Sequence, residues 1–134
     1  MPRLTSGSTL ILTAALIAGV SAAPAFAATA AKATSLNLRS AHATVAPKAK
    51  DTLTGTLKAG NAAVANEKVT LEQRSGTTGK FSVVRSALTN SKGLVTFTVT
   101  PGTKKGQKEQ YELVHASDAK YKASHSQIIT VTVK

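Results

Sequence analysis

Cysteine and tryptophan are both absent from the 134 residues, and acidic side chains are few. Without cysteine the chain has no disulfide framework, no thiol nucleophile, no thiolate metal site and no acylated lipoprotein cysteine. The lack of tryptophan argues against a sugar-stacking platform. Six Asp and Glu residues argue against a calcium site, because such sites draw on several carboxylate oxygens. The length corresponds to one domain.

Long hydrophobic runs are also scarce, and the most extended one lies near the N-terminus. Residues 10–20 (LILTAALIAGV) follow the basic Arg3 and precede Ala25-Phe26-Ala27. A positive segment, an apolar segment and an A-x-A site in this order predict a secretory signal peptide over residues 1–27. The apolar run is about half of the roughly 20 residues that span a bilayer. We therefore expect a secreted, extracellular product without a transmembrane segment after cleavage.

The rest of the chain is strongly basic. Arg3 contributes one unit of the formal +11 charge, so residues 28–134 carry +10. Most of these cations are lysines, which supply point charge without the bidentate geometry of arginine and so favour diffuse attraction. Two interpretations stay open: a solubilising surface, or retention on an anionic envelope of phosphate-rich wall polymers or acidic lipid head groups.

Alternation of apolar and polar residues recurs after residue 33 and is typical of half-buried strands. In LVTFTVT at 94–100 and QIITVTVK at 127–134, apolar and polar residues alternate. Turn-forming sequences such as GTTG at 76–79 and PGTKKG at 101–106 separate these runs. We expect strands at residues 34–40, 52–58, 68–74, 80–86, 94–100, 109–116 and 127–133, with a further short piece in 42–46.

About seven strands in roughly 100 residues fit an all-β fold, a single immunoglobulin-like β-sandwich over residues 34–134. Residues 28–33 are expected to form a flexible N-terminal segment. Tyr111 opens the sixth expected strand, where such sandwiches often place a tyrosine whose hydroxyl bonds nearby backbone. The expected core consists of Leu36, Leu38, Leu53, Leu57, Val69, Leu71, Phe81, Val83, Val95, Phe97, Val99, Tyr111, Leu113, Ile129, Val131 and Val133.

Several stretches of the chain are similar to sequences of a known family. They include LTGTL at 53–57, VTLEQR at 69–74, GLVTFTVTP at 93–101, and YELV at 111–114 with ASDAKY at 116–121. The chain resembles the bacterial immunoglobulin-like domains of secreted actinobacterial proteins. It departs from them at His115, where an aromatic residue is common. The resemblance implies a fold and an extracellular setting, and it brings no catalytic residues.

No pattern of catalytic or metal-ligating residues is recognisable. The histidines are His42, His115 and His125, and no nucleophile elbow or H-x-E-x-H motif accompanies them. His115 shares a strand face with Tyr111 and is expected to be partly buried and hydrogen-bonded at the strand end. GTTGK at 76–80 leads into a strand instead of a helix, which argues against a phosphate loop. We predict that the protein is not an enzyme and has no cofactor and no metal.

The candidate binding surface is made of cationic loop residues with one tyrosine. Lys48 and Lys50 form a further basic loop, which we expect at a different end of the sandwich from the lysines that follow residue 103, so the charge should be spread. Tyr121 is the one ring expected to be exposed, which argues against nucleic acid, since sheet modules stack bases on exposed aromatics. The candidate residues are Lys104, Lys105, Lys108, Lys120, Tyr121, Lys122, Arg74 and Lys80.

These patterns predict a secreted, basic, non-enzymatic module that binds a protein or an anionic cell-wall polymer, by charge, at the cell envelope. The alternative is a secreted inhibitor of an extracellular hydrolase, in which residues 102–108 would enter a trypsin-like pocket through a lysine. No disulfide braces that loop, which weighs against the inhibitor. Neither the partner nor the oligomeric state follows from the sequence.

Overall fold

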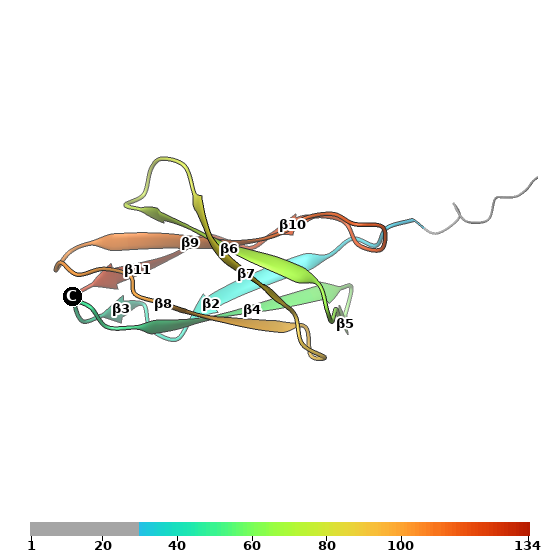
Figure 1. Ribbon diagram of the computed structural model, residues 1–134, viewed down its shortest axis with the longest axis horizontal. Coiled ribbons are helices and arrows are strands. Elements are labelled where there is room, and N and C mark those ends of the chain that lie inside the picture. The colour runs from blue at the N-terminus through green and yellow to red at the C-terminus, as the bar shows by residue number, and fades with distance from the viewer. Residues whose placement is uncertain (1–29) are drawn as a thin grey trace, which may run out of the picture. The chain divides into compact units, whose positions relative to one another are not determined.

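The computed structural model describes residues 30–134, so the signal peptide expected at residues 1–27 lies outside the described residues. Residues 32–134 form one compact unit, and its regular structure consists of strands (Figure 1). No helix long and apolar enough to cross a membrane occurs in the described residues. The prediction of an all-β fold is confirmed.

Each of the seven expected segments contains a strand whose ends differ by at most two residues from the expected ones. The further piece expected in 42–46 contains β3, whereas β5 and β10 were not expected. The strands are β2 (Ser35–Ser40), β3 (Thr44–Val45), β4 (Asp51–Ala59), β5 (Ala62–Ala63), β6 (Lys68–Ser75), β7 (Ser82–Leu88), β8 (Leu94–Val99), β9 (Lys108–His115), β10 (Ser124–His125) and β11 (Ile129–Val133).

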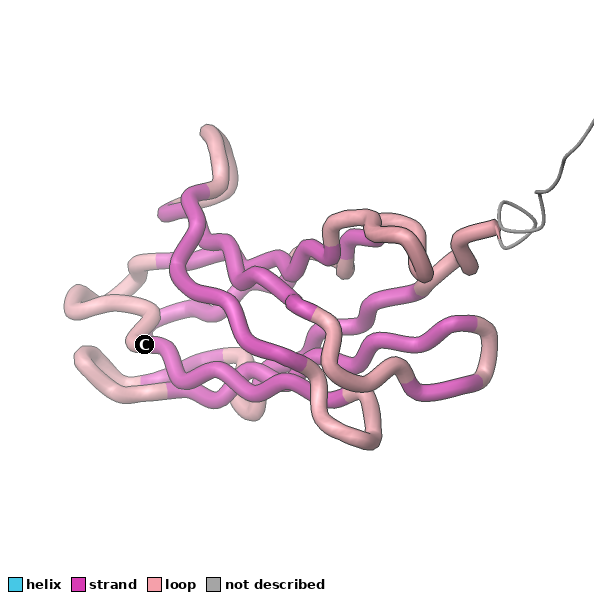
Figure 2. The backbone as a smooth tube through the Cα atoms, turned by 45° about the vertical axis from the view of Figure 1, so that its right-hand side comes forward, coloured by secondary structure: helices cyan, strands magenta, loops and turns pink. Residues whose placement is uncertain are grey.

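The strands form two sheets that face each other in a sandwich-like arrangement (Figures 1 and 2). One sheet has the order β3-β11-β9-β6-β7, with β10 also paired to β9, and the other joins β2, β4 and β8, with β5 at the end of β4. β3 runs parallel to β11, and the other strand pairs are antiparallel. Before β2, Lys32 forms a parallel bridge with Tyr121.

The core between the sheets contains most of the residues expected there. Phe81, Val83 and Ile129 were expected in it but are not fully buried, and Val83 is 66% exposed. Val45 and Val64, which lie outside the seven expected strands, are buried instead. The confirmed core residues are Leu36, Leu38, Leu53, Leu57, Val69, Leu71, Val95, Phe97, Val99, Tyr111, Leu113, Val131 and Val133.

A β-bulge explains why Val83 faces solvent. Leu71 pairs with Arg85 but the next residue, Glu72, pairs with Val83, so Val84 is an extra residue in β7. An inserted residue reverses the inward–outward alternation of everything beyond it. Val84 is therefore half-buried while Val83 is exposed, and Arg85, although exposed, pairs with Leu71 and so lies on the same face of the sheet.

Gly55 lies where a side chain of the opposite sheet packs directly against the backbone of β4. It sits on the buried row of β4, paired with Leu38 on β2 and Val95 on β8. A Cβ atom placed on Gly55 would overlap Leu113 Cδ1 from the opposite sheet and come within 2.9 Å of Val95 Cγ2. The absence of a side chain here is what lets Leu113 pack against β4.

We expect Gly55→Ala to lower the free energy of unfolding by about 1–3 kcal/mol, because a methyl group forced into a packed core displaces its neighbours. Urea denaturation monitored by circular dichroism measures the change. Ser82→Ala, at an exposed strand position, is the control and should change stability by no more than about 0.5 kcal/mol. Equal stability of Gly55→Ala and the parent protein would show that the sheets do not approach each other as described.

The hydroxyl of Tyr111 does not bond the backbone as expected. Tyr111 is completely buried, and its Oη has no hydrogen-bond partner within residues 30–134. Asp51 Oδ2 and Glu109 Oε2 are also buried without a partner in this part of the chain. Burial raises the pKa of Tyr111 above its ordinary value near 10, and the negative charges of Glu109 and Asp51 raise it further. The folded protein thus favours the neutral, protonated form of the Tyr111 side chain.

Alkaline titration tests this environment. The pKa of Tyr111 is raised in the folded state, so its full contribution to the free energy of unfolding is present below pH 10. That contribution is lost as the pH rises further, because the unfolded chain then releases the phenolic proton. In Tyr121→Phe, which leaves Tyr111 as the single phenol, absorbance at the phenolate wavelength should rise only above pH 10 and together with unfolding. Tyr111→Phe should lose less stability over the same range. Ionisation near pH 10 in a folded protein would contradict the burial.

Candidate functional site

Six exposed lysines gather where β4 begins and β11 ends. Backbone hydrogen bonds join the loops that carry them: Lys48 N donates to Gly102 O at 2.8 Å, and Gly106 N donates to Val133 O at 2.7 Å. Lys134 N donates to Val45 O at 2.8 Å. In Figure 1 the β8–β9 loop lies at the same end as the C-terminus. We call this region the basic end; it contains Lys48, Lys50, Lys104, Lys105, Lys108 and Lys134.

The expectation that Lys48 and Lys50 lie at a different end from Lys104 is therefore wrong. The loop before β4 lies beside the loop after β8 because β4 and β8 are antiparallel neighbours, with Asp51 paired to Val99. The start of one strand then lies beside the end of the other. The basic side chains of these two loops form one patch.

Arg74 and Lys80 approach the basic end from the β6–β7 loop. Ser75 pairs with Glu109, and Gly76 N donates to Lys108 O at 2.8 Å. Arg74 shapes this projecting loop, since its Nη1 donates to Gly79 O at 3.0 Å and its guanidinium stacks 4.5 Å from the centre of the Phe81 ring. Phe81 is therefore covered by Arg74 instead of entering the core.

The remaining candidate residues lie at the opposite end. Lys120, Tyr121 and Lys122 belong to the β9–β10 loop, which follows His115 at the far end of β9. Seven residue steps of about 3.4 Å separate Lys108 from His115, or about 24 Å. Tyr121, expected to be exposed, is half-buried against the core. Five of the eight predicted residues thus come together, and these three do not join them.

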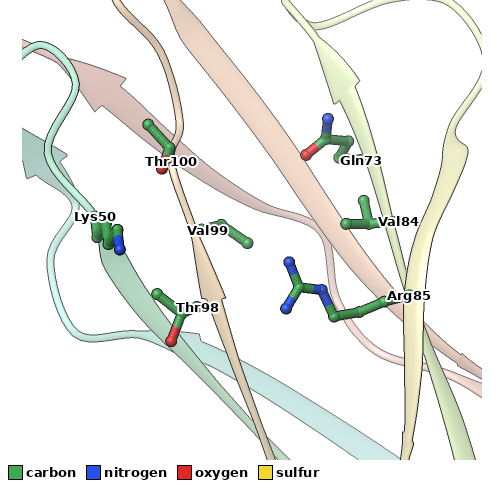
Figure 3. Close-up of a pocket in the computed structure, with 7 residues that line it drawn as sticks. All are labelled: Lys50, Gln73, Val84, Arg85, Thr98, Val99 and Thr100. Atoms are coloured by element: carbon green, nitrogen blue, oxygen red, sulfur yellow. The ribbon is translucent and has the colours of Figure 1, made fainter.

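A groove of about 340 Å³ opens beside the basic end, between the edge strands β7 and β8. Figure 3 shows Arg85 reaching from β7 toward Thr98 and Val99 of β8. Lys50 and Gln73 also line it. Among the described residues, Arg85 has no hydrogen bond or ion pair, so its guanidinium donors are available to a ligand in the groove. The sequence does not show that the edges of β7 and β8 leave a groove at this residue.

The carboxylates near the basic end are buried. Asp51 is 2% exposed and Glu109 is 4% exposed. Asp51 Oδ1 accepts hydrogen bonds from the backbone N–H groups of His42 and Thr52, at 3.1 and 3.0 Å. Within residues 30–134, the ion pairs involve histidine only, so none of the lysines or arginines there is paired with a carboxylate. The exposed charge of this end is positive.

The loop that carries Lys104 and Lys105 is a closed turn. Gln107 Oε1 accepts hydrogen bonds from the backbone of Thr103 and Lys104, at 3.2 and 3.4 Å. Gln107 N donates in turn to Lys104 O at 3.1 Å. The amide of Gln107 thus braces the loop in place of a disulfide and holds its two lysines outward.

A second group of polar side chains lies at the far end. His115 is 1% exposed, as its inward strand position predicts, and its Nδ1 lies 3.1 Å from Lys122 O while its Nε2 lies 3.0 Å from Glu67 Oε1. Asp118 is the third member, and one ligand atom from each residue lies within 4.8 Å of the others. The cluster was missed because residues 67, 115 and 118 follow no ligand spacing known from sequence.

The Asp118 carboxyl is held in its charged form. A hydrogen bond with the Glu67 side chain is the main cause that holds the pKa of Asp118 below its ordinary value, and the backbone N–H groups of Tyr121 and Lys120 contribute. Both N–H groups donate to Oδ1 at 2.8 Å. His125, by contrast, is exposed and meets only Glu112 Oε2, at 3.5 Å.

Comparison with known proteins adds no assignment. No protein-family model matches the chain, and no curated protein matches it with significant similarity. The resemblance to bacterial immunoglobulin-like domains therefore stays a prediction from the sequence, and function has to be argued from the surface of the domain itself.

Proposed function

We propose that the protein is a secreted, non-enzymatic module that binds an anionic cell-wall polymer through the basic end. The observation that carries this proposal is the segregation of charge there. Six exposed lysines share one patch, while the neighbouring carboxylates, Asp51 and Glu109, are buried. A surface of one sign attracts a polyanion and raises the rate of its association.

The far end does not cancel this field. The two ends are about 24 Å apart along β9, which exceeds the Debye length of about 8 Å at physiological ionic strength. A polymer at the basic end therefore interacts with its lysines almost independently of Glu67 and Asp118. Binding is a property of one end of the domain and not of its net charge.

The groove between β7 and β8 supplies a geometric element. A flexible polymer chain lying along it would meet Arg85 and Lys50 together. Arg85 presents a planar fork that can donate two parallel hydrogen bonds to one phosphate. Repeated phosphates fit this combination better than isolated carboxylates, so we propose a phosphate-rich wall polymer as the ligand class.

We also propose that the sandwich is of the immunoglobulin type. The sheet β2-β4-β8 corresponds in strand order to strands A, B and E of such domains, and β11-β9-β6-β7 corresponds to G, F, C and C′. The division of the N-terminal strands between the sheets, with β3 parallel to β11, supports the comparison. Domains of this architecture commonly bind through end loops, which is where the lysines lie.

A secreted inhibitor of an extracellular hydrolase is the alternative, and the loop geometry supports it less well. A residue that enters a protease pocket is presented on extended backbone, so that the loop can pair with the enzyme as a strand. Residues 103–107 instead form a turn closed by Gln107. Trypsin inhibition by the intact protein would favour this alternative over the polymer.

The polymer proposal is tested by co-sedimentation of the protein with isolated cell walls. We expect the triple variant Lys104→Gln, Lys105→Gln, Lys108→Gln to bind at least about tenfold more weakly, because it removes three charges from the patch. Arg85→Gln should weaken binding as well. Raising NaCl from about 0.05 M to about 0.5 M should release the parent protein, since screening shortens the range of these interactions.

The matched control is Lys92→Gln, Lys120→Gln, Lys122→Gln, which removes the same charge from exposed positions at the far end. Its affinity should stay within about twofold of the parent. An equal loss in both triple variants would mean that net charge alone drives retention. Binding that resists salt would rule out the electrostatic mechanism.

A further inference from the structure

We propose that Glu67, His115 and Asp118 form a site for Zn²⁺ at the far end of the domain. His115 ends β9 on its inner face, Glu67 immediately precedes β6, and Asp118 lies in the β9–β10 loop. Together with Asn66, Lys68 and Ser117 they line a hollow of about 380 Å³. The proposal concerns residues at the end opposite to the basic end and does not depend on polymer binding.

The hydrogen bonds of His115 identify which nitrogen is available. A carbonyl oxygen only accepts, so the 3.1 Å contact with Lys122 O places the proton on Nδ1. In the neutral imidazole, Nε2 then carries a lone pair. This is the arrangement that orients histidine ligands in metal sites, where backbone carbonyls commonly accept from the nitrogen that does not bind the metal.

Nε2 faces a carboxylate oxygen, which is itself a metal ligand. Nε2 lies 3.0 Å from Glu67 Oε1, and two lone pairs at that distance repel each other unless a proton or a metal ion lies between them. The side chain of His115 is 1% exposed, so water cannot take the place of a partner freely. With a proton between Nε2 and Oε1 this contact is a hydrogen bond, and a metal ion can take the place of that proton because both atoms can offer a lone pair to it.

Asp118 brings a second carboxylate to the same point. One of its carboxylate oxygens lies within 4.8 Å of a Glu67 oxygen, and two carboxylates that close repel each other when both are charged. Its Oδ1 is already occupied by the N–H groups of Lys120 and Tyr121, which leaves Oδ2 for a ligand. No lysine or arginine in residues 30–134 forms an ion pair with either carboxylate. A divalent cation would neutralise both.

The donor set selects Zn²⁺ over the alkaline-earth ions. Zn²⁺ accepts one imidazole nitrogen and two carboxylate oxygens at about 2.0–2.2 Å, whereas Ca²⁺ and Mg²⁺ prefer sites made of oxygen alone. Tetrahedral bonds of that length place ligand atoms roughly 3.3 Å apart. The Nε2–Oε1 separation of 3.0 Å is already close to this value. Atoms at the 4.8 Å limit would have to close by about 1.5 Å, which the exposed Asp118 loop permits.

Titration calorimetry of the full chain with zinc chloride tests the site. We expect one Zn²⁺ per chain with a Kd of about 10 µM or lower, an increase in Tm on binding, and no binding of Ca²⁺ or Mg²⁺ at the same concentrations. On Zn²⁺ addition, the ¹⁵N signal of His115 Nε2 should shift, while the signal of Nδ1 should remain that of a protonated nitrogen. Absence of one-site binding would overturn the proposal.

Two conservative variants locate the site without opening the core. Asp118→Asn keeps the Oδ1 acceptor for the Lys120 and Tyr121 N–H groups, and Glu67→Gln can donate an N–H to His115 Nε2, so both should fold. Each should weaken Zn²⁺ binding at least about tenfold. The control His125→Ala removes an exposed histidine that faces Glu112 and should leave the Kd unchanged. Loss of binding in His125→Ala, or its persistence in both conservative variants, would refute the assignment.

Discussion

Strand β9 turns one row of side chains toward the interior, and the rest of the domain is arranged around that row. Tyr111 and Leu113 occupy its middle, where Leu113 packs over the bare backbone of Gly55. Glu109 and His115 occupy its ends and are buried as well. A buried ionisable group is costly without partners. Glu109 and His115 therefore determine which polar groups are needed around each end of the row. The domain thereby acquires two chemically different ends from a single strand.

At the basic end, the consequence is an uncompensated surface charge. Asp51 and Glu109 are the acidic side chains of this end, and the inward rows of β4 and β9 take both of them out of solvent. Lysines that share a patch without acidic partners repel one another and lower the stability of the fold. The proposed binding of a polyanion would relieve the repulsion among these lysines.

Periodicity in the sequence predicted the regular part of the fold and missed what depends on local irregularity. Alternation located the seven longer strands, and with them most of the core. It placed Val83 inside because one extra residue, Val84, reverses the alternation in β7, and a bulge leaves no trace in a pattern of period 2. The groove at Arg85 depends on β7 and β8 being edge strands of the two sheets, which the alternation does not report. The joining of Lys48 and Lys104 into one patch, and of Glu67, His115 and Asp118 into one cluster, depends on which strands are neighbours, which spacing along the chain does not report.

The two ends differ in how their interactions respond to the surroundings. Lysines on exposed loops act through a field that salt screens within about 10 Å, so the proposed contacts with a polymer at the basic end would be reversible and sensitive to salt. The far end instead offers oriented metal-ligand side chains: Lys122 O orients His115, and two backbone N–H groups orient Asp118. Lys32, at the start of the compact unit, donates to Lys120 O in the same loop. A Zn²⁺ ion bound to Asp118 would therefore order the β9–β10 loop, which holds Lys32 at the start of the compact unit. This loop lies at the end opposite to the basic end. If both proposals hold, anchoring of the chain and attraction of a partner lie at opposite ends of β9.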